Sequence, residues 1–445
     1  MSDSQSELDA RDVILLFVRF PEPGKVKTRL QLALSGEQAC AIYQRVATRT
    51  IQTVREFAQQ SGAAWEAHFA GGSENELQGE FGPGVYVAQC GESLGDRLTY
   101  AFERAFSRGA RRVIVIGTDC YDLDGATLRT AFAALREHDA VIGPATDGGY
   151  YLLGMRQFWS GWFQGIPWGT NEVFQATCAV AKRSHAKLKQ LRNLSDIDYV
   201  DDLLTHRRVD SELTDLLPTT HAGRLSVIIP AINEAQCLTQ TLATVGPPAA
   251  NLEIIFVDGG SQDASLQLAA DWGCTVIRSP AGRAKQMNAG AVVSSGDTLM
   301  FLHADTRLPP KYRSHIERCL AAGNMLGAFR LSIATDSLVL RGVAHGANCR
   351  ARFFSMPYGD QALFMRAETF FAVAGYPNLP IMEDVELVRS VRHRGRVATC
   401  DAPVSTSARR WQRKGIAQTV LLNQFYLAAY MLGVRPQTIA DWYRR

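Results

Sequence analysis

The sequence predicts an α/β protein of two tandem Rossmann-like domains, each with a mainly parallel sheet and helices on both faces. Two observations support this fold class. Residues 12–20 and 224–234 begin alike, because each is an apolar strand pattern followed by a polar or glycine-containing turn and a helical pattern. Strand and helix patterns then alternate through both halves of the 445 residues, a length that suits two or three domains.

The remaining strand patterns show where each sheet lies. They occupy residues 111–117, 138–145 and 150–154 in the first half, and residues 252–258, 274–279 and 298–305 in the second. Helical patterns such as 95–107 and 261–272 alternate with these strands. In such sheets ligands bind beyond the carboxyl ends of the strands, so polar residues that end an apolar run are the candidates for a site.

The domain limits follow from a loss of pattern in the middle of the chain. Residues 210–223 lack strong periodicity and carry Pro218 and Gly223. We predict a disordered N-terminus at 1–11, a first domain at 12–217, a linker at 218–223, and a second domain with a C-terminal helical segment at 224–445.

Composition excludes some classes of partner and favours a cytoplasmic protein. The 47 Lys and Arg residues against 44 Asp and Glu leave a charge of only +3, which gives no reason to expect a nucleic-acid partner. The cysteines are nine in number without a C-x-x-C pair, and the polar, acidic start lacks the pattern of an export signal. The apolar segment 419–432 is interrupted by Asn423 and Gln424 and is too short to span a bilayer, so it predicts a core or interfacial helix with at most weak peripheral membrane contact.

Asp258 ends a buried strand in the second half and is the first candidate site residue. Gly259 and Gly260 then allow a tight turn into a helix that Ser261 or Asp263 could cap. A carboxylate at this place can accept hydrogen bonds from a base or a ribose. The alternative is a simple strand-to-helix turn, and the absence of G-x-G-x-x-G argues against a dinucleotide oxidoreductase.

His303 and Asp305 end the next strand pattern, about 40 residues later. Side chains at positions i and i+2 of an extended strand point the same way, so both could face one divalent ion and the diphosphate that it neutralises. A surface strand end that merely carries polar residues is the alternative.

Two further segments add charge to this half. Arg283 and Lys285 stand among small residues at 282–290, where they could contact a base or a phosphate, although a solvated basic turn would look the same. Glu383 and Asp384 stand where a helical pattern begins, a place that also favours carboxylates for capping alone. Sugar transfer with inversion needs a base for the acceptor hydroxyl and a metal for the departing diphosphate, and one acidic residue suffices for each task.

The second half resembles the inverting family 2 glycosyltransferases of the GT-A fold over residues 224–415. The similar segments follow in the expected order: SVIIPAINEA, VDGGSQDAS, GRAKQMNAGA, FLHADT, YGDQALFMR, MEDVELVRSVRHRG and ARRWQRKG. The resemblance implies a nucleotide pocket lined by Pro230, Asn233, Glu234, Asp258 and Arg283. It also implies that Asp305 is the metal ligand, with His303 where many relatives carry Asp, and that Asp384 is the acceptor base beside Glu383.

The last of these segments contains Arg410 and Trp411. It resembles the family's late basic-aromatic element, which could cover the diphosphate, and the alternative is a solvated basic helix end with one packed Trp. More narrowly, HADT, GDQALF and ARRWQRKG are similar to a bacterial subgroup named for arsenosugar biosynthesis or for association with radical-SAM and selenodomain proteins.

In the first half, a loop after the first strand carries Lys25, Lys27 and Arg29. Three cations at alternate positions suit a triphosphate or sugar phosphate, and a basic surface loop is the alternative. The Walker A pattern is absent. Asp119 follows a buried strand and Asp147 lies in a glycine turn, and together they could hold Mg²⁺ and orient a nucleoside triphosphate, unless Asp147 is only a turn residue.

The first half resembles a bacterial GT-A-like nucleotidyltransferase family related to phospholactate guanylyltransferase and molybdenum-cofactor guanylyltransferase. The resemblance covers residues 12–204, through PEPGKVKTRL, QCGESLGDR, GTDCYDL, GPATDGGYYLLG, IPWGT and LSDIDYVDDL. It implies phosphate binding by the three cations and metal or substrate binding by Asp119 and Asp147. Tyr121 stands where many relatives have Pro.

Together the two halves predict a fused enzyme. The first would make or bind a nucleotide-activated sugar, and the second would transfer that sugar from the donor to a small-molecule acceptor with Mg²⁺ or Mn²⁺ as cofactor. Two alternatives stay open: a single active glycosyltransferase with a non-catalytic N-terminal nucleotide-binding scaffold, or a binding protein that senses nucleotides, which would not need an acceptor base.

Overall fold

The computed structural model describes residues 12–206, 210–335, 337–407 and 416–444. The predicted disorder of 1–11 lies outside these residues. Contacts group the chain into two compact units, one of residues 1–31 and 35–198, the other of residues 32–34 and 199–445. This grouping passes from the first unit to the second between residues 198 and 199. The predicted domain limits at 217/218 and 223/224 stay predictions.

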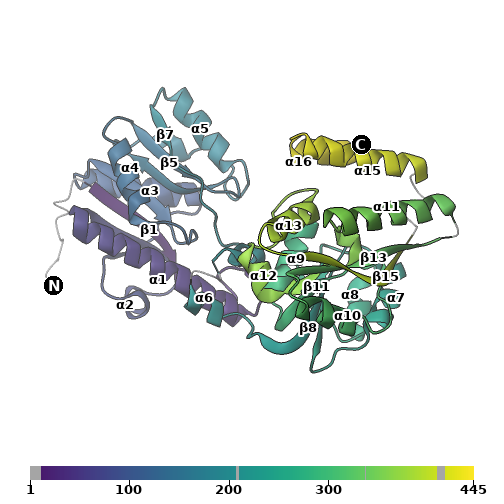
Figure 1. The fold of residues 1–445 in the computed structure, drawn as a ribbon. Helices are drawn as coiled ribbons and strands as arrows, with labels where there is room; N and C mark the ends of the chain where they lie inside the picture. The colour runs from purple at the N-terminus through teal and green to yellow at the C-terminus, as the bar shows by residue number, and fades with distance from the viewer. Residues whose placement is uncertain (1–11, 207–209, 336, 408–415, 445) are drawn as a thin grey trace. The chain divides into compact units, whose positions relative to one another are not determined.

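The first unit is built on a seven-stranded sheet in the order β3-β2-β1-β4-β6-β5-β7. Its strands are β1 (Asp12–Arg19), β2 (Ala64–Ala70), β3 (Tyr86–Ala88), β4 (Arg112–Gly117), β5 (Ala140–Pro144), β6 (Tyr150–Met155) and β7 (Leu188–Gln190). All neighbours are parallel except β6, which runs antiparallel to β4 and β5. Its helices are α1 (Gly36–Ser61), α2 (Glu74–Phe81), α3 (Leu94–Ser107), α4 (Gly125–Ala134) and α5 (Val173–Arg183) (Figure 1).

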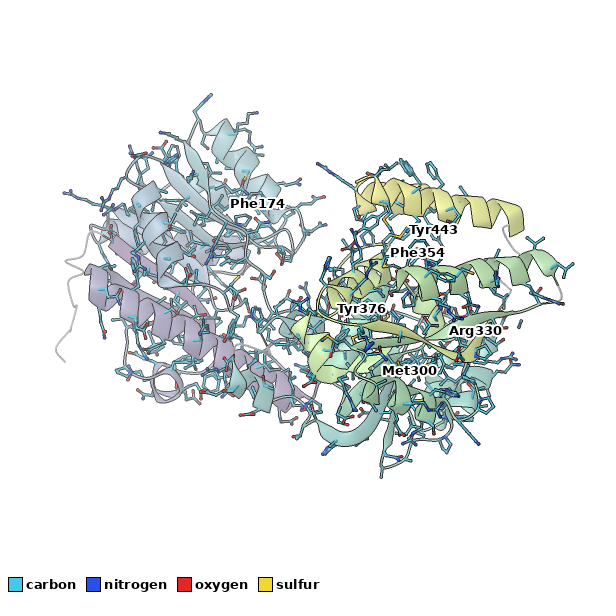
Figure 2. All side chains as sticks on the ribbon, in the orientation of Figure 1. Phe174, Met300, Arg330, Phe354, Tyr376 and Tyr443 are labelled. Atoms are coloured by element: carbon cyan, nitrogen blue, oxygen red, sulfur yellow. The ribbon has the colours of Figure 1, made fainter. Side chains whose placement is uncertain are left out.

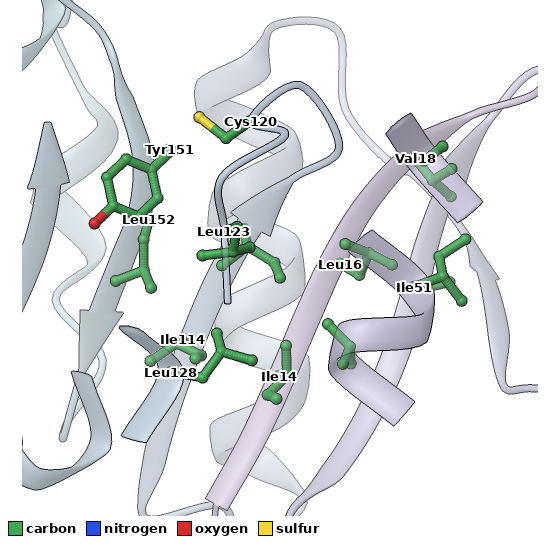
Figure 3. Packing of buried hydrophobic residues seen from close by; sticks show 14 of the residues in the cluster. Ile14, Leu16, Val18, Ile51, Ile114, Cys120, Leu123, Leu128, Tyr151 and Leu152 are labelled. Carbon is green, nitrogen blue, oxygen red and sulfur yellow. The ribbon is translucent and has the colours of Figure 1, made fainter. Parts of the chain in front are cut away.

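Both faces of this sheet are buried, which is why β1 is a continuous apolar run. Ile14, Leu16 and Val18 pack with α1, α2 and α4 in one cluster, part of which Figure 3 shows. Val13 and Leu15 point to the other face and pack with α3 and α5. Alternation along one strand therefore supplies both cores.

The second unit has an eight-stranded sheet in the order β10-β9-β8-β11-β14-β13-β15-β12. Its strands are β8 (His221–Ala231), β9 (Leu252–Asp258), β10 (Thr275–Arg278), β11 (Gly296–Phe301), β12 (Thr306–Arg307), β13 (Leu326–Ala334), β14 (Phe364–Arg366) and β15 (Val397–Ser407). Neighbours from β10 to β11 are parallel, whereas β14 is antiparallel to β11 and β13. The predicted fold class, α/β with mainly parallel sheets, is confirmed for both units, each sheet being mixed.

Helices cover this second sheet on both faces (Figure 1). The helices of the second unit are α6 (Ser211–Asp215), α7 (Ala235–Val245), α8 (Ser265–Asp271), α9 (Arg283–Val292), α10 (Tyr312–Ala321), α11 (Leu338–Phe354), α12 (Ala367–Ala372), α13 (Glu383–Arg392), α15 (Ile416–Met431) and α16 (Pro436–Arg444). Helices α7, α8 and α10 share one apolar cluster with β8 and β9. Helix α9 lies on the opposite face, where a Cβ at Gly290 would stand 2.5 Å from the side chain of Ile228, so only glycine permits this approach.

Strand order reverses beside β1 in the first unit, because β2 and β3 lie on one side of β1 and β4 on the other. It reverses in the same way beside β8 in the second unit, with β9 and β10 on one side and β11 on the other. In open α/β sheets ligands bind at such switch points, outside the carboxyl ends of the strands. Helix α15 contains most of the predicted interfacial segment 419–432, whose membrane contact stays a prediction. Within the described ranges, none of the helices combines the length and apolar character that crossing a bilayer requires.

Candidate functional site

In the second unit, the loops that follow β8 and β9 are tied together by side chains. The Asp258 carboxylate accepts hydrogen bonds from the backbone N–H groups of Gly260 (3.1 Å) and Ser261 (2.9 Å). Asn233, in the left-handed conformation with φ 58°, donates its N–H to Ser261 Oγ (2.9 Å) and accepts from the Gln262 N–H (2.8 Å). These bonds hold the predicted nucleotide-binding residues at one sheet edge.

Two more of the five predicted residues of this pocket, Pro230 and Glu234, belong to the same framework. Pro230 is buried within β8 beside Val257 of β9, and the backbone N–H of Glu234 donates to Ser265 Oγ (2.9 Å). The expectation that Ser261 or Asp263 caps the helix was wrong, because α8 begins only at Ser265 and its N-cap position is Ala264, which has no side-chain cap. Asp263 does accept from the Ser265 N–H (3.0 Å), whereas Ser261 accepts from the neighbouring loop instead.

A buried glutamine on α9 supports both loops. Gln286 donates through Nε2 to the carbonyl oxygens of Ala231 (3.0 Å) and Val257 (2.9 Å), at the ends of β8 and β9. Its side chain therefore satisfies buried backbone acceptors at the places where the strands stop. Sequence reasoning missed this residue, because a glutamine in a helix carries no signal of the partners that it finds across the sheet.

Arg283, Lys285, Glu383 and Asp384 line one pocket of about 640 Å³. The two cations lie in the first turn of α9, and the two carboxylates in the first turn of α13. Lys285 also lies 5.8 Å from the ring centre of Tyr199. The structure thus brings together four residues that sequence analysis placed in separate motifs about 100 residues apart.

The carboxylates at the start of α13 differ in their surroundings. Asp384 accepts from the Gly359 N–H (2.8 Å) and from the Val385 N–H (2.8 Å), whereas the N-cap position of α13 is Met382, which has no side-chain cap. Glu383 is only 6% exposed. Burial, reinforced by the charge of Asp384 and opposed by Arg283, raises the pKa of Glu383 to about 7. Met382, just before them, has a φ of 68°, a strained conformation for a side chain of this size.

His303 and Asp305 do not have the predicted strand geometry. Strand β11 ends at Phe301, and residues 304 and 305 lie in a turn closed by the Thr306 N–H donating to the His303 carbonyl (3.0 Å). The argument from positions i and i+2 of a strand was therefore wrong. His303 nevertheless lies near Asp384, because a Cβ at Gly359 would stand 3.2 Å from His303 Nε2 and 3.4 Å from Asp384 Oδ2.

Asp305 is held through its backbone, whose carbonyl accepts from the Ser407 N–H (3.2 Å). Its side chain is half-buried. Among the residues that the structure describes, no group of three or more His, Cys, Asp or Glu side chains is arranged to hold a metal ion.

Asp360 and Tyr376 belong to the same region and were not singled out from the sequence. In the described part of the chain, Asp360 Oδ1 and the Tyr376 hydroxyl are buried without a hydrogen-bond partner. Burial raises the pKa of Asp360 to about 6, with Arg350 opposing and Asp384 reinforcing the shift. Burial and the charges of Asp384 and Glu383 raise the pKa of Tyr376 well above its usual value. Figure 2 labels Tyr376 within the unit.

In the first unit, Lys27 and Asp119 meet at the switch point between β1 and β4. Lys27 Nζ lies 2.5 Å from Asp119 Oδ1 and 3.6 Å from Asp198 Oδ1, and its side chain is only 5% exposed. Burial acts against its charge, but Asp119 and Asp198 outweigh this effect and raise the pKa of Lys27. Arg29 pairs with Asp198 (2.5 Å), whereas Lys25 points to solvent and pairs with Glu22 (2.6 Å).

Asp196 is a further acidic residue of this site that sequence analysis did not single out. Its Oδ1 accepts from the Cys120 thiol (2.5 Å). Burial raises the pKa of Asp196 to about 7, opposed by the Cys120 hydrogen bond and reinforced by Asp119 and Asp147. Asp147 itself accepts from the Gly149 N–H (2.8 Å), as its turn alternative expected, while its charge acts on the cluster. The segment LSDID at 194–198 was part of the quoted pattern, but only the fold shows that it returns to β4.

Arg410 and Trp411 lie outside the described residues, so their predicted role stays a prediction.

Comparison with protein families assigns each unit separately. Residues 226–326 match the model described as glycosyl transferase family 2, and residues 30–170 match the one described as an uncharacterized protein conserved in bacteria, DUF2064. The second unit carries a family 2 glycosyltransferase domain. The match includes Asp258 at the end of β9, Arg283 at the start of α9 and Asp305 in the turn after β11, while Glu383 and Asp384 follow beyond it. Glycosyl transfer is thus the class of activity that the family 2 domain supports.

Several solved structures are similar to parts of the chain. A protein from Desulfovibrio desulfuricans G20, proposed to be a nucleotide-diphospho-sugar transferase, is 32% identical over 46% of this chain and 93% of its own, with a TM-score of 0.43. Over that length this chain belongs to the same family. S. aureus TarS 1–349 in complex with UDP-GlcNAc is 16% identical over 42% of this chain and 59% of its own, with a TM-score of 0.34. The mannosyltransferase PcManGT from Pyrobaculum calidifontis, in complex with GDP-Man and Mn²⁺, is 18% identical over 50% and 70%, with a TM-score of 0.37.

Proposed function

We propose that the second unit transfers a sugar, with inversion, from a nucleotide-diphosphate donor to a small acceptor. One observation carries this proposal: the cations at the start of α9 and the carboxylates at the start of α13 line the same pocket of a family 2 domain. Such a pocket can hold an anionic leaving group and a base in one place.

Helix α9 supports the binding of the donor diphosphate. Its first backbone N–H groups, together with Arg283 and Lys285, favour phosphate oxygens by hydrogen bonding and by charge. We assign the nucleoside to the loops after β8 and β9, through Pro230, Asn233, Glu234 and Asp258. The cross-bonds between these loops favour a preformed pocket there.

Asp384 is the base of the proposed reaction. The acceptor oxygen forms a bond to the anomeric carbon of the sugar while its proton passes to a carboxylate oxygen of Asp384. The bond from that carbon to the diphosphate breaks, and the nucleoside diphosphate leaves with the electron pair. Glu383, beside it, keeps a proton more readily than an ordinary glutamate because its pKa is about 7.

Mg²⁺ or Mn²⁺ fits the residues around Asp305. Such ions are often held by one or two protein side chains plus phosphate oxygens and water, so a site of two protein ligands that the donor completes is chemically sufficient. Asp305 and His303 would hold the ion, which when bound stabilises the charge that develops on the diphosphate.

For the first unit, we propose that it makes or binds the activated sugar through Lys27, Arg29, Asp119 and Asp147, with Lys25 at the edge. The ion pairs of Lys27 and Arg29 with Asp119 and Asp198 favour a second candidate, a non-catalytic nucleotide-binding scaffold, because these cations are already neutralised. Nucleoside triphosphates and sugar 1-phosphates added to the protein distinguish the two, since only synthesis releases pyrophosphate.

The Asp384→Asn variant tests the proposed transfer. A screen of UDP-, GDP- and dTDP-sugars first identifies a donor that the protein hydrolyses or transfers, with and without EDTA to test the metal. We expect the variant to bind that donor as before while turnover falls at least about a hundredfold, since the amide cannot accept the proton. Glu386→Gln, on the same helix, serves as the control. Equal loss of donor affinity and turnover, with a lower melting temperature, would show that Asp384 only stabilises its helix.

A further inference from the structure

The pocket of Arg283 and Asp384 has a second wall, which comes from the C-terminal helices. Helix α15 contributes Tyr426 and Leu427, and helix α16 contributes Gln437, Ala440 and Tyr443. The two helices pack on each other (Figure 1). They lie beyond the family 2 match, which ends at residue 326, so the match alone does not define this wall.

This wall is anchored to the segment that carries the carboxylates. Tyr426 and Ile439 are buried in one apolar cluster with Ile381 and Met382, the residues that lead into Glu383. Tyr443 joins the same cluster, and Figure 2 shows it on the C-terminal helices. Because the strained Met382 packs in this cluster, the helices also help to fix the backbone in front of Glu383.

The two walls differ in chemistry. Among the lining residues that the structure describes, the four charged ones lie at the starts of α9 and α13, whereas those of α15 and α16 are aromatic, aliphatic or amide side chains. The segment between the walls adds Leu379, Ile381 and Met382 to the uncharged part. A molecule that spans the pocket therefore meets charge at one end and an apolar, aromatic surface at the other.

The size of the pocket leaves room for a second molecule beside the transferred sugar. Pockets that enclose drug-sized ligands measure roughly 300 to 1,000 Å³, and the volume here is about 640 Å³. A sugar bound to the diphosphate at the cationic wall would leave the apolar wall to the acceptor.

We propose that the acceptor is an alcohol with an apolar body, which lies against Tyr426, Leu427 and Tyr443 while its hydroxyl reaches Asp384. This inference rests on the proposed function and names the acceptor class of the same site. The hydroxyl oxygen becomes the glycosidic oxygen, its proton goes to Asp384, and the nucleoside diphosphate leaves. Burial of the apolar body supplies the binding free energy that a small polyol would lack.

A series of primary alcohols tests the acceptor class with the full-length protein. Ethanol, 1-butanol, 1-hexanol and 2-phenylethanol are supplied with the donor found in the nucleotide-sugar screen, and the alkyl glycosides are quantified by mass spectrometry. We expect kcat/KM to rise up to about fourfold per added methylene, the factor that corresponds to full burial of one CH₂ group. 2-Phenylethanol should exceed ethanol at least tenfold.

Two leucines provide a matched pair of variants. Leu427 lines the pocket, whereas Leu432, just after the same helix, is 86% exposed and lies outside it. In Leu427→Asn, kcat/KM should depend less on the chain length of the alcohol, while hydrolysis of the donor by water persists. In Leu432→Asn, the dependence of kcat/KM on chain length should equal that of the wild type. Gln437→Leu should have the opposite effect. Because it replaces an exposed polar lining residue with an apolar one, kcat/KM should rise more steeply with the length of the alcohol than in the wild type.

The outcomes separate this inference from the function on which it rests. A flat alcohol series with intact donor hydrolysis would overturn the acceptor class and leave the proposed transfer standing. Equal effects of Leu427→Asn and Leu432→Asn, with no steepening in Gln437→Leu, would overturn the assignment of the wall. Failure to turn over any nucleotide-sugar would overturn the proposed function and the acceptor class together.

Discussion

Glu383 is a single residue whose burial links stability to pH. Its pKa of about 7 in the folded protein exceeds the ordinary value of 4.5, so the folded state binds this proton more tightly than the unfolded state. The free energy of unfolding therefore falls as pH rises from about 4.5 to 7, and the full loss is present above that range. Glu383→Gln removes this loss.

We expect the Glu383→Gln variant to gain stability relative to the wild type between pH 5 and pH 8, by on the order of 1 to 3 kcal/mol. Urea unfolding at both pH values measures the difference. Glu386→Gln is the control, since Glu386 is partly exposed and paired with Arg389 (2.8 Å). A difference from wild type that does not change with pH would mean that Glu383 is ionised throughout.

At this scale, sequence reasoning found residues that stand at the ends of patterns. Asp258 and Asp384 were recognisable because one ends a strand run and the other begins a helix within a family-like segment. Asp196 and Asp360 were missed, since their raised pKa values come from burial and from charges far away in the chain. Burial of a short polar segment leaves no periodic signal, so only the fold could reveal them.

At the scale of the element, helix α9 both lines the pocket and supports the loops beside it. Its first turn lines the pocket, while Gln286 in the middle bonds the ends of β8 and β9. We expect Gln286→Leu to lower the free energy of unfolding by about 1 to 3 kcal/mol, because buried carbonyls lose a partner. Donor affinity should also fall, since both loops begin at these carbonyls.

Urea unfolding and a donor titration measure the two effects of Gln286→Leu. Gln267→Leu on α8 is the matched control, because Gln267 is exposed and bonds only Asp271 (2.7 Å) among the contacts found. It should change stability by less than about 0.5 kcal/mol. A Gln286→Leu protein with full donor affinity would show that the loops keep their form without α9.

Strands were predictable where burial gives the sequence a recognisable pattern of apolar residues. The strand pattern at 111–117 corresponds to β4 at 112–117, and the pattern at 252–258 to β9. The pattern at 298–305 ran four residues too far, because a buried Leu302 and Ala304 continue the apolar character into a loop and turn after β11 has ended. The pocket wall made by α15 and α16 was beyond such patterns, since it depends on where the helices pack.

At the scale of the whole molecule, the segment from residue 199 to the start of β8 groups with the second unit. The 3₁₀ helix η3 (Val200–Leu204) packs against α9 of the second unit, and Val200, Leu203 and Leu204 are buried. The sequence limits place this segment in the first domain, because a short apolar group without periodicity does not reveal which core it joins. Lys285 of α9 also lies over the Tyr199 ring.

Two fragments of the chain distinguish these divisions. We expect residues 199–445 to fold and to transfer sugar from supplied donor, because they keep η3 against α9. Residues 224–445 should be less stable by several kcal/mol, since the three apolar side chains of η3 are lost and each buried side chain of this kind contributes roughly 1.5 to 3 kcal/mol. Urea unfolding and the donor assay measure both. If 224–445 matches 199–445 in stability and activity, the limit at 218–223 is the functional boundary and the contact of η3 with α9 contributes no stability. If both fragments fold but neither transfers sugar, the second unit needs the first for its chemistry.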